Sequence, residues 1–141
     1  MRSLLAMGAL AMLLSGCESS GGGGGTTPGD EPRIVESFTC REVDSQSRPT
    51  GITEIFYQSL DERIYTWVEW ENVGGAHTTQ AVWYDPGGSR NFDSSQQFNS
   101  PTGEQITWFY VDPAGMSVGR WEVELWLDNA FHRSHFFVVE E

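Results

Sequence analysis

Basic residues are scarce in this sequence, and lysine is missing altogether. Eight arginines stand against 20 aspartate and glutamate residues, and the formal net charge is −12 at pH 7. A chain this acidic repels the phosphates of nucleic acids and of anionic lipids, which excludes both as expected partners. A divalent cation or a basic protein surface fits the charge better.

Helical periodicity is also missing beyond the first 16 residues. Short runs rich in β-branched and aromatic residues alternate instead with clusters of glycine, proline, asparagine and aspartate. This pattern predicts strands joined by turns. The predicted strands are Val35–Val43, Ile52–Tyr57, Ile64–Val73, His77–Tyr84, Asn91–Phe98, Gln105–Asp112, Arg120–Asp128 and His132–Val139. Turns are predicted at Asp85–Gly88 and Asp112–Gly115.

The last two strands give the clearest alternation. Trp121, Val123, Leu125 and Leu127 point to one side of a strand, whereas Trp126 and its alternate neighbours point to the other. If Asn129 and Ala130 form the hairpin loop, Val123 faces Phe136 and Trp121 faces Val138. We therefore expect Trp121 to be buried and Trp126 to face outward.

The N-terminus carries one charge, Arg2, followed by the apolar run Leu4–Leu14. This run is too short to span a bilayer as a stable helix but has the length of a signal-peptide core. It ends in Leu14, Ser15, Gly16 and Cys17. This ending resembles the lipobox of bacterial lipoproteins, in which the cysteine receives a diacylglycerol, the chain is cut before it (here between Gly16 and Cys17), and a further acyl chain such as palmitate is often added. An ordinary secreted protein with a stray cysteine is the alternative.

The predicted organisation has three parts: a signal peptide at residues 1–16, a lipidated cysteine and tether at 17–33, and a β-sandwich domain at 34–141. The tether contains five successive glycines, Gly21–Gly25, and little that can bury apolar area. Membrane attachment would be through the lipid alone, since acyl chains contribute about 0.8 kcal/mol per buried methylene. The resemblance to lipoproteins implies the cell envelope, and glutamate rather than aspartate at position 18 favours the outer membrane, facing the periplasm or the cell surface.

A second resemblance concerns the fold. The stretch Gly119–Leu125, followed by a turn and by Phe136 and Val138, is similar to the last two strands of bacterial immunoglobulin-like or fibronectin-III-like domains, and Trp83–Gly87 is similar to a strand and turn of such modules. The resemblance implies an all-β, antiparallel sandwich of seven or eight strands, which the strand count also favours. Such a fold carries no active site of its own.

Cysteine and histidine offer little for metal binding or redox chemistry. With Cys17 acylated, Cys40 has no partner, and since it shares a strand face with apolar residues we expect a buried, inert thiol. An intermolecular disulfide or a metal ligand is the alternative. His132 and His135 are separated by an odd number of residues, so they lie on opposite faces of a strand; a zinc or copper site would need His77 or an acid brought in by the fold. We expect no metal and no cofactor.

Two pairs of acidic residues are a feature that suggests catalysis. Glu69 with Glu71, and Glu122 with Glu124, lie two residues apart and thus on one face of each strand. Glycosidases use two carboxylates that flank a cleft. A domain of this size rarely builds such a cleft, and acids on a sheet surface are usually solvated. The sequence therefore favours a protein that is not an enzyme.

Aromatic residues are abundant, with six tryptophans, four tyrosines and eight phenylalanines. If the strand Ile64–Val73 lies in one sheet with the hairpin of Arg120–Asp128 and His132–Val139, the outer face of that sheet gathers rings and charges that form a candidate ligand face. These residues are Tyr65, Trp67, Glu69, Glu124, Trp126 and Arg133. A cation–π stack of Trp126 on Arg133, with Trp67 covered by a loop, is the structural alternative.

Two functions remain open. One is a non-catalytic envelope protein whose sandwich docks a protein partner as a structural accessory, and the other is a carbohydrate-binding module held at the membrane. An uncovered apolar edge strand would favour the first, and a planar row of exposed rings would favour the second.

Overall fold

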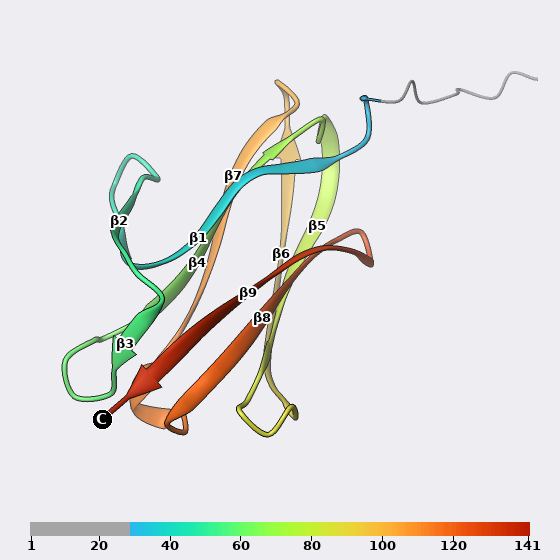
Figure 1. Ribbon diagram of the computed structural model, residues 1–141. Helices are drawn as coiled ribbons and strands as arrows, with labels where there is room; N and C mark the ends of the chain where they lie inside the picture. The colour runs from blue at the N-terminus through green and yellow to red at the C-terminus, as the bar shows by residue number, and fades with distance from the viewer. Residues whose placement is uncertain (1–28) are drawn as a thin grey trace, which may run out of the picture.

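The computed structural model describes residues 29–141, and in this range the chain forms nine strands (Figure 1). The strands are β1 (Arg33–Val43), β2 (Pro49–Ile52), β3 (Ile55–Tyr57), β4 (Ile64–Glu71), β5 (Gly75–Tyr84), β6 (Arg90–Ser100), β7 (Glu104–Val111), β8 (Gly119–Leu127) and β9 (Ala130–Glu140), with one 3-10 turn at Pro113–Gly115. The predicted signal peptide, Cys17 and most of the predicted tether lie outside the described residues. No described helix is long and apolar enough to cross a membrane.

Two sheets pack face to face. Sheet A has the order β2-β1-β4-β7, and sheet B has the order β3-β9-β8-β5-β6. Trp70 of sheet A and Trp83 and Trp121 of sheet B are the largest of the fully buried side chains between them. The predicted all-β sandwich is confirmed.

β4 shows how the sequence pattern sets the faces of a strand. Ile64, Thr66, Val68 and Trp70 point into the sandwich and are all buried, as the alternation predicts. The indole N–H of Trp70 donates to the hydroxyl of Thr107 at 2.9 Å, so the buried ring keeps its polar atom satisfied.

The predicted strand Ile52–Tyr57 is wrong as a single element, because the chain passes from one sheet to the other within it. β2 pairs antiparallel with β1 in sheet A, whereas β3 pairs parallel with the end of β9 in sheet B (Figure 1). This parallel pair is also a departure from the predicted antiparallel pattern. The other seven predicted strands agree with the observed bounds to within two residues.

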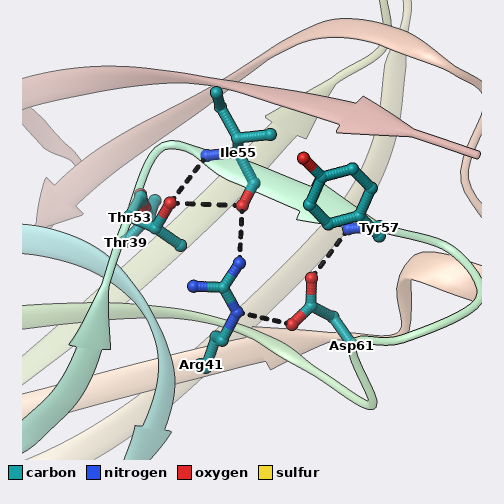
Figure 2. Close-up of polar contacts among 6 residues, drawn as sticks. All are labelled: Thr39, Arg41, Thr53, Ile55, Tyr57 and Asp61. Carbon is teal, nitrogen blue, oxygen red and sulfur yellow. Dashed lines mark hydrogen bonds and ion pairs between the residues drawn. The ribbon is translucent and has the colours of Figure 1, made fainter.

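A polar network holds this crossing in place (Figure 2). Arg41 of β1 donates from Nε to Asp61 at 2.7 Å and from its terminal nitrogen to the carbonyl of Ile55 at 3.1 Å. Asp61 in turn accepts the backbone N–H of Tyr57 at 2.7 Å. The carboxylate of Asp61 is 7% exposed, so its two donors replace the water it has lost. The network fastens β3 and the loop after it to sheet A.

The hairpin of β8 and β9 forms where predicted, but its register is shifted. Its two loop residues are Asp128 and Asn129, with φ of 48° and 65°, the left-handed values of a type I′ turn. A β-bulge follows the turn, where the register shifts between Leu125 and Trp126. Beyond this bulge Trp121 pairs with Phe137 rather than Val138, and Val123 with His135 rather than Phe136.

The extra residue of the bulge turns the β9 side chains over, since neighbouring residues of a strand face opposite sides. Phe137 and Val139 are buried, and Phe136 is exposed. Trp121 is 1% exposed, and Trp126 lies on the opposite side of β8 from the buried Leu125 and Leu127, so the predicted faces of β8 are confirmed.

Both predicted turns are present. The N–H of Gly88 donates to the carbonyl of Asp85 at 2.8 Å, and Pro113 begins the 3-10 turn, whose Met116 N–H returns to the Pro113 carbonyl. At the other end of the domain, the Asn72 side-chain amide donates to the carbonyls of Gly29 and Glu31, so the last residues of the predicted tether contact the sandwich.

Candidate functional site

The predicted ligand face does not form, because its strands lie in different sheets. β4 pairs with β1 and β7 in sheet A, whereas β8 pairs with β5 and β9 in sheet B. Tyr65, Trp67 and Glu69 therefore lie on the outer face of sheet A, and Glu124 and Trp126 on the outer face of sheet B. The alternation of β4 and β8 predicts which residues face outward, but not that they face away from each other.

Trp67 is covered by a loop, as the structural alternative predicts. Its ring is 5% exposed, stacks on Phe38 with centroids 5.9 Å apart, and donates its indole N–H to the carbonyl of Ser47 at 2.7 Å. Trp67 is thus part of a small apolar cluster beneath the loop after β1. It offers no surface to a ligand.

Arg133 points inward, which corrects the prediction that it lies beside Trp126. Because of the shifted register, its guanidinium reaches across to sheet A and donates to the Ser37 hydroxyl at 3.1 Å and to the Ile34 carbonyl at 3.4 Å. The predicted cation–π pair with Trp126 is accordingly wrong, and the ring of Trp126 meets Phe131 edge-on instead.

The outer face of sheet B keeps a reduced version of the predicted cluster. One oxygen of Glu124 accepts the indole N–H of Trp126 at 3.0 Å and the hydroxyl of Tyr84 at 3.2 Å. Burial, followed by the charge of Glu124, raises the pKa of Tyr84. Trp126 and Phe131 are inclined at 73°. The carboxylate of Glu124 is therefore hydrogen-bonded to side chains of the same face, and this face presents no flat row of rings.

The outer face of sheet A carries exposed rings at its β7 edge. Tyr65 and Tyr110 lie 5.5 Å apart and are inclined at 49°. The guanidinium of Arg63 sits 4.4 Å over the ring of Tyr110 and donates to the Tyr65 hydroxyl at 3.1 Å. Trp108, next in line on β7, is 37% exposed, and Tyr110 is 52% exposed. These β7 rings were not among the predicted site residues, although their alternation along Gln105–Asp112 marks them as outward-facing.

The edge strands β6 and β7 border an open part of the sandwich. Two hollows adjoin there and share Ser94 and Tyr110, one of about 650 Å³ and the other of about 500 Å³. The first is lined by Asn91, Phe92, Asp93, Ser94, Tyr110, Val111, Asp112 and Gly115, and the second by Ser94, Ser95, Gln96, Trp108, Phe109 and Tyr110. We refer to the two together as the β6–β7 groove. It combines apolar rings, unpaired strand edges and two carboxylates.

A third hollow, of about 440 Å³, contains a histidine beside a carboxylate. Nδ1 of His77 lies 2.6 Å from Asp128, and Nε2 lies 3.2 Å from the carbonyl of Gly74. Both ring nitrogens are thus engaged, and neither is free to act as a general base. Asp128 also accepts the backbone N–H of Thr78, which with His77 lowers the pKa of its carboxyl. This pair fastens the β8–β9 turn to β5.

The sequence also contains Gly115, Ser117 and Gly119 in the spacing of the nucleophile elbow of α/β-hydrolases. That motif requires a strand before the serine and a helix after it. Here a 3-10 turn precedes Ser117 and strand β8 follows. In the described residues no hydrogen bond joins Ser117 to a histidine, and its carbonyl accepts the indole N–H of Trp121.

Cys40 is buried, and the remaining histidines are partly buried. Cys40 is fully buried, as predicted, and burial raises the pKa of its thiol to about 11. His135 lies 2.5 Å from the Ser37 hydroxyl, and His132 packs edge-on against Trp70. Burial lowers the pKa of both imidazoles. Within residues 29–141 no three histidine, cysteine or acidic side chains come together as metal ligands.

No protein-family model and no curated protein sequence matches the chain. Solved structures do. An immunoglobulin-like protein from Pseudomonas aeruginosa is 14% identical with a TM-score of 0.51, over 78% of this chain and 97% of that one. The alkylpurine DNA glycosylase AlkC from Pseudomonas fluorescens, bound to DNA with an abasic-site analogue, is 12% identical with a TM-score of 0.51, over 79% of this chain but only 31% of the glycosylase. At such identities the likeness concerns the fold alone, and the fold of this chain is immunoglobulin-like.

Proposed function

We propose that this chain is a non-catalytic envelope lipoprotein, anchored through Cys17, whose sandwich docks a protein partner at the β6–β7 groove. The anchor is proposed on the lipobox sequence at residues 14–17. Attachment to the outer membrane is proposed on the glutamate, rather than aspartate, at position 18. The docking role is proposed on the structure of the open side of the sandwich.

The observation that carries the docking role is the exposure of apolar side chains along an unpaired strand edge. β7 pairs with β4 on one side only, and its other side opens on the groove. Trp108 and Tyr110 project from this edge. Exposed edges that carry large apolar side chains are sites where other chains associate, and globular proteins usually cover them.

A glycan is less well supported than a protein. Sugar rings stack on aromatic faces that lie flat and free, whereas Tyr65 and Tyr110 are inclined to each other and Arg63 covers one face of Tyr110. On sheet B the Phe136 ring is similarly covered by Arg120 at 3.9 Å. Trp108 is the ring best placed to stack on a sugar, so a carbohydrate-binding module remains the second candidate.

The test compares proteins retained from envelope extracts of the host by the wild-type chain, by a Trp108→Ala/Tyr110→Ala variant, and by a Phe136→Ala variant. Phe136 is exposed on sheet B and serves as a matched control for loss of a surface ring. We expect a protein retained by the wild type and by the control but not by the β7 variant. A glycan array run with the same three proteins tests the second candidate.

If the wild type and both variants retain the same proteins equally, the groove is not the docking site. Binding to a glycan that depends on Trp108, with no protein retained, would replace the protein partner by a carbohydrate. Since both substituted β7 residues are exposed, the variant should keep its fold, and an unchanged melting temperature checks this.

A further inference from the structure

We propose that β7 receives an extended, basic peptide as an added strand of sheet A. This inference rests on the proposed docking function and specifies the chemistry of the partner. It is argued from the backbone of β7, from the side chains that now occupy its free edge, and from the charge of the groove.

The ladder between β4 and β7 is regular. Its pairs run from Ile64 with Val111 to Glu71 with Glu104 with no shift of register. In an antiparallel strand the N–H and C=O groups of one residue point to the same side, and successive residues alternate. Half of the β7 backbone groups therefore bond to β4, and the other half point toward the groove in an evenly spaced row.

Side chains identify which half faces the groove. The carbonyl of Trp108 accepts the side-chain amide of Gln96 at 3.3 Å, and that of Ile106 accepts the side-chain amide of Gln105 at 3.0 Å. The carbonyl of Glu104 accepts the hydroxyl of Ser100 at 2.7 Å. All three carbonyls belong to alternate residues, as one edge requires.

The side-chain amides of Gln96 and Gln105 occupy positions that the backbone N–H groups of an added strand would take, whereas the Ser100 hydroxyl is buried and closes the end of the edge beside Glu104. An amide on a flexible side chain is readily displaced by a backbone amide, because the exchange replaces one hydrogen bond by another of the same kind. The edge is thus satisfied in the free protein and remains available to a partner. Peptides that add a strand to a sheet edge bind in this manner.

The charge of the groove selects a basic partner. Asp93 and Asp112 line it, and its lining includes no lysine or arginine. Asp93 is paired with Arg90 at 2.6 Å, but Asp112 forms no ion pair in the described part of the chain. The surrounding protein adds to the negative potential, with a net charge of −12.

The rings of β7 favour arginine in particular. Arg63 already lies over Tyr110, which shows that this edge accommodates a guanidinium on an aromatic face. Within residues 29–141 no such cation lies over Trp108. An arginine at an outward position of the added strand can stack there, while residues at alternate positions point inward toward Phe92 and the apolar part of the groove.

The experiment uses the full chain in detergent and a peptide of alternating arginine and valine with the length of β7, 8 residues. Two matched peptides accompany it: one with glutamate in place of arginine, and one with arginine and valine but with alternate backbone nitrogens methylated. We expect the first peptide to bind and both others to bind at least about tenfold more weakly, since one lacks the charge and the other lacks the backbone donors. Equal binding of the methylated peptide would mean that charge alone attracts the peptide, and would overturn strand addition.

Amide hydrogen exchange locates the contact. With the arginine–valine peptide bound, the amide hydrogens of Ile106, Trp108 and Tyr110 should exchange more slowly, whereas those of the alternate β7 residues, already bonded to β4, should be unchanged. Uniform protection of β7, or protection confined to another strand, would contradict the proposal.

Removing the side-chain donor gives an independent check. Gln96→Ala should bind the peptide about three- to tenfold more tightly, because the peptide no longer competes with the glutamine amide. Gln97→Ala is the matched control, since Gln97 is exposed on the other face of β6, and its affinity should equal that of the wild type. Weaker binding by Gln96→Ala would show that Gln96 contacts the peptide and does not cap the edge.

Failure of this inference differs from failure of the proposed function. If no peptide binds, yet the Trp108→Ala/Tyr110→Ala variant still loses a protein from envelope extracts, the groove docks a folded surface and strand addition is wrong. If that variant loses nothing, the proposed function falls as well.

Discussion

The ring of Phe92 on β6 stacks on the ring of Trp121 on β8, with centroids 5.9 Å apart and planes inclined at 17°. Phe92 lines the β6–β7 groove and Trp121 belongs to the core. The Phe92 side of the groove is therefore packed directly against the core, which holds the groove in its conformation in the free protein.

Replacing Trp121 by alanine should unfold much of the protein. The ring is buried and donates to the Ser117 carbonyl at 2.8 Å, so its loss leaves a cavity and an unpaired acceptor. We expect a cost of about 3 to 5 kcal/mol, a large part of the stability of a domain this size. Urea denaturation measures it. Trp126→Ala is the matched control, and its loss should be about 0.5 to 1.5 kcal/mol, because the ring faces outward and has only Glu124 and Phe131 as partners. A larger loss at Trp126 would contradict the observed faces of β8.

Removing the carboxylate of Asp61 should loosen the crossing from sheet A to sheet B. Asp61→Ala leaves the Tyr57 N–H and the Arg41 guanidinium without their acceptor, at an expected cost of about 1 to 3 kcal/mol. A double-mutant cycle with Arg41→Ala should show coupling between the two. Additive losses would mean that Asp61 acts through the backbone of Tyr57 alone.

For β8 the sequence predicts which side chains are buried but not how the strand pairs with β9. Its alternation identifies Trp121 as buried and Trp126 as outward, because the period of a strand depends only on local geometry. The register of the hairpin was missed, since it depends on whether Asp128 or Asn129 begins the turn, and both residues tolerate positive φ. The bulge between Leu125 and Trp126, which the alternation of β8 does not reveal, exchanges Phe136 with Phe137 and turns Arg133 inward.

The candidate ligand face failed for a different reason. Alternation in β4 and β8 says which side chains leave the core but not which sheet each strand joins, and sheet membership depends on pairings between residues far apart in the chain. The β6–β7 groove was likewise beyond prediction, although Trp108 and Tyr110 alternate visibly. Only the pairing of β7 with β4 alone leaves their edge open.

Stability should fall as the pH is lowered below about 6.5. Burial lowers the pKa of His132 and His135 from the ordinary value of 6.5, so the folded state holds both rings neutral while the unfolded chain takes up protons. The stabilisation is complete above the unfolded pKa and is lost as the pH falls through and below it. Urea midpoints at about pH 7.5 and 5.5 should differ more for the wild type than for a His132→Gln/His135→Gln variant. Equal differences would show that other groups cause the pH dependence.

Substitution of Cys17 by serine should abolish lipidation, because a hydroxyl cannot form the thioether. We expect unprocessed precursor by mass spectrometry and loss of incorporated palmitate. Cys40→Ser is the matched control and should be lipidated normally, since Cys40 is buried in the domain. Correct cleavage and normal membrane partitioning of Cys17→Ser would contradict the proposed anchor.

Photo-crosslinking detects whether the open edge of β7 docks a protein in the cell. A photoreactive phenylalanine analogue is placed at Tyr110 on that edge or, as a control, at Phe136 on the outer face of sheet B, both of them exposed positions. We expect a discrete adduct of higher mass from position 110, absent from position 136 and lost when Trp108 is also changed to alanine. Adducts from position 136 alone, or none from position 110 in intact cells, would contradict docking at this edge.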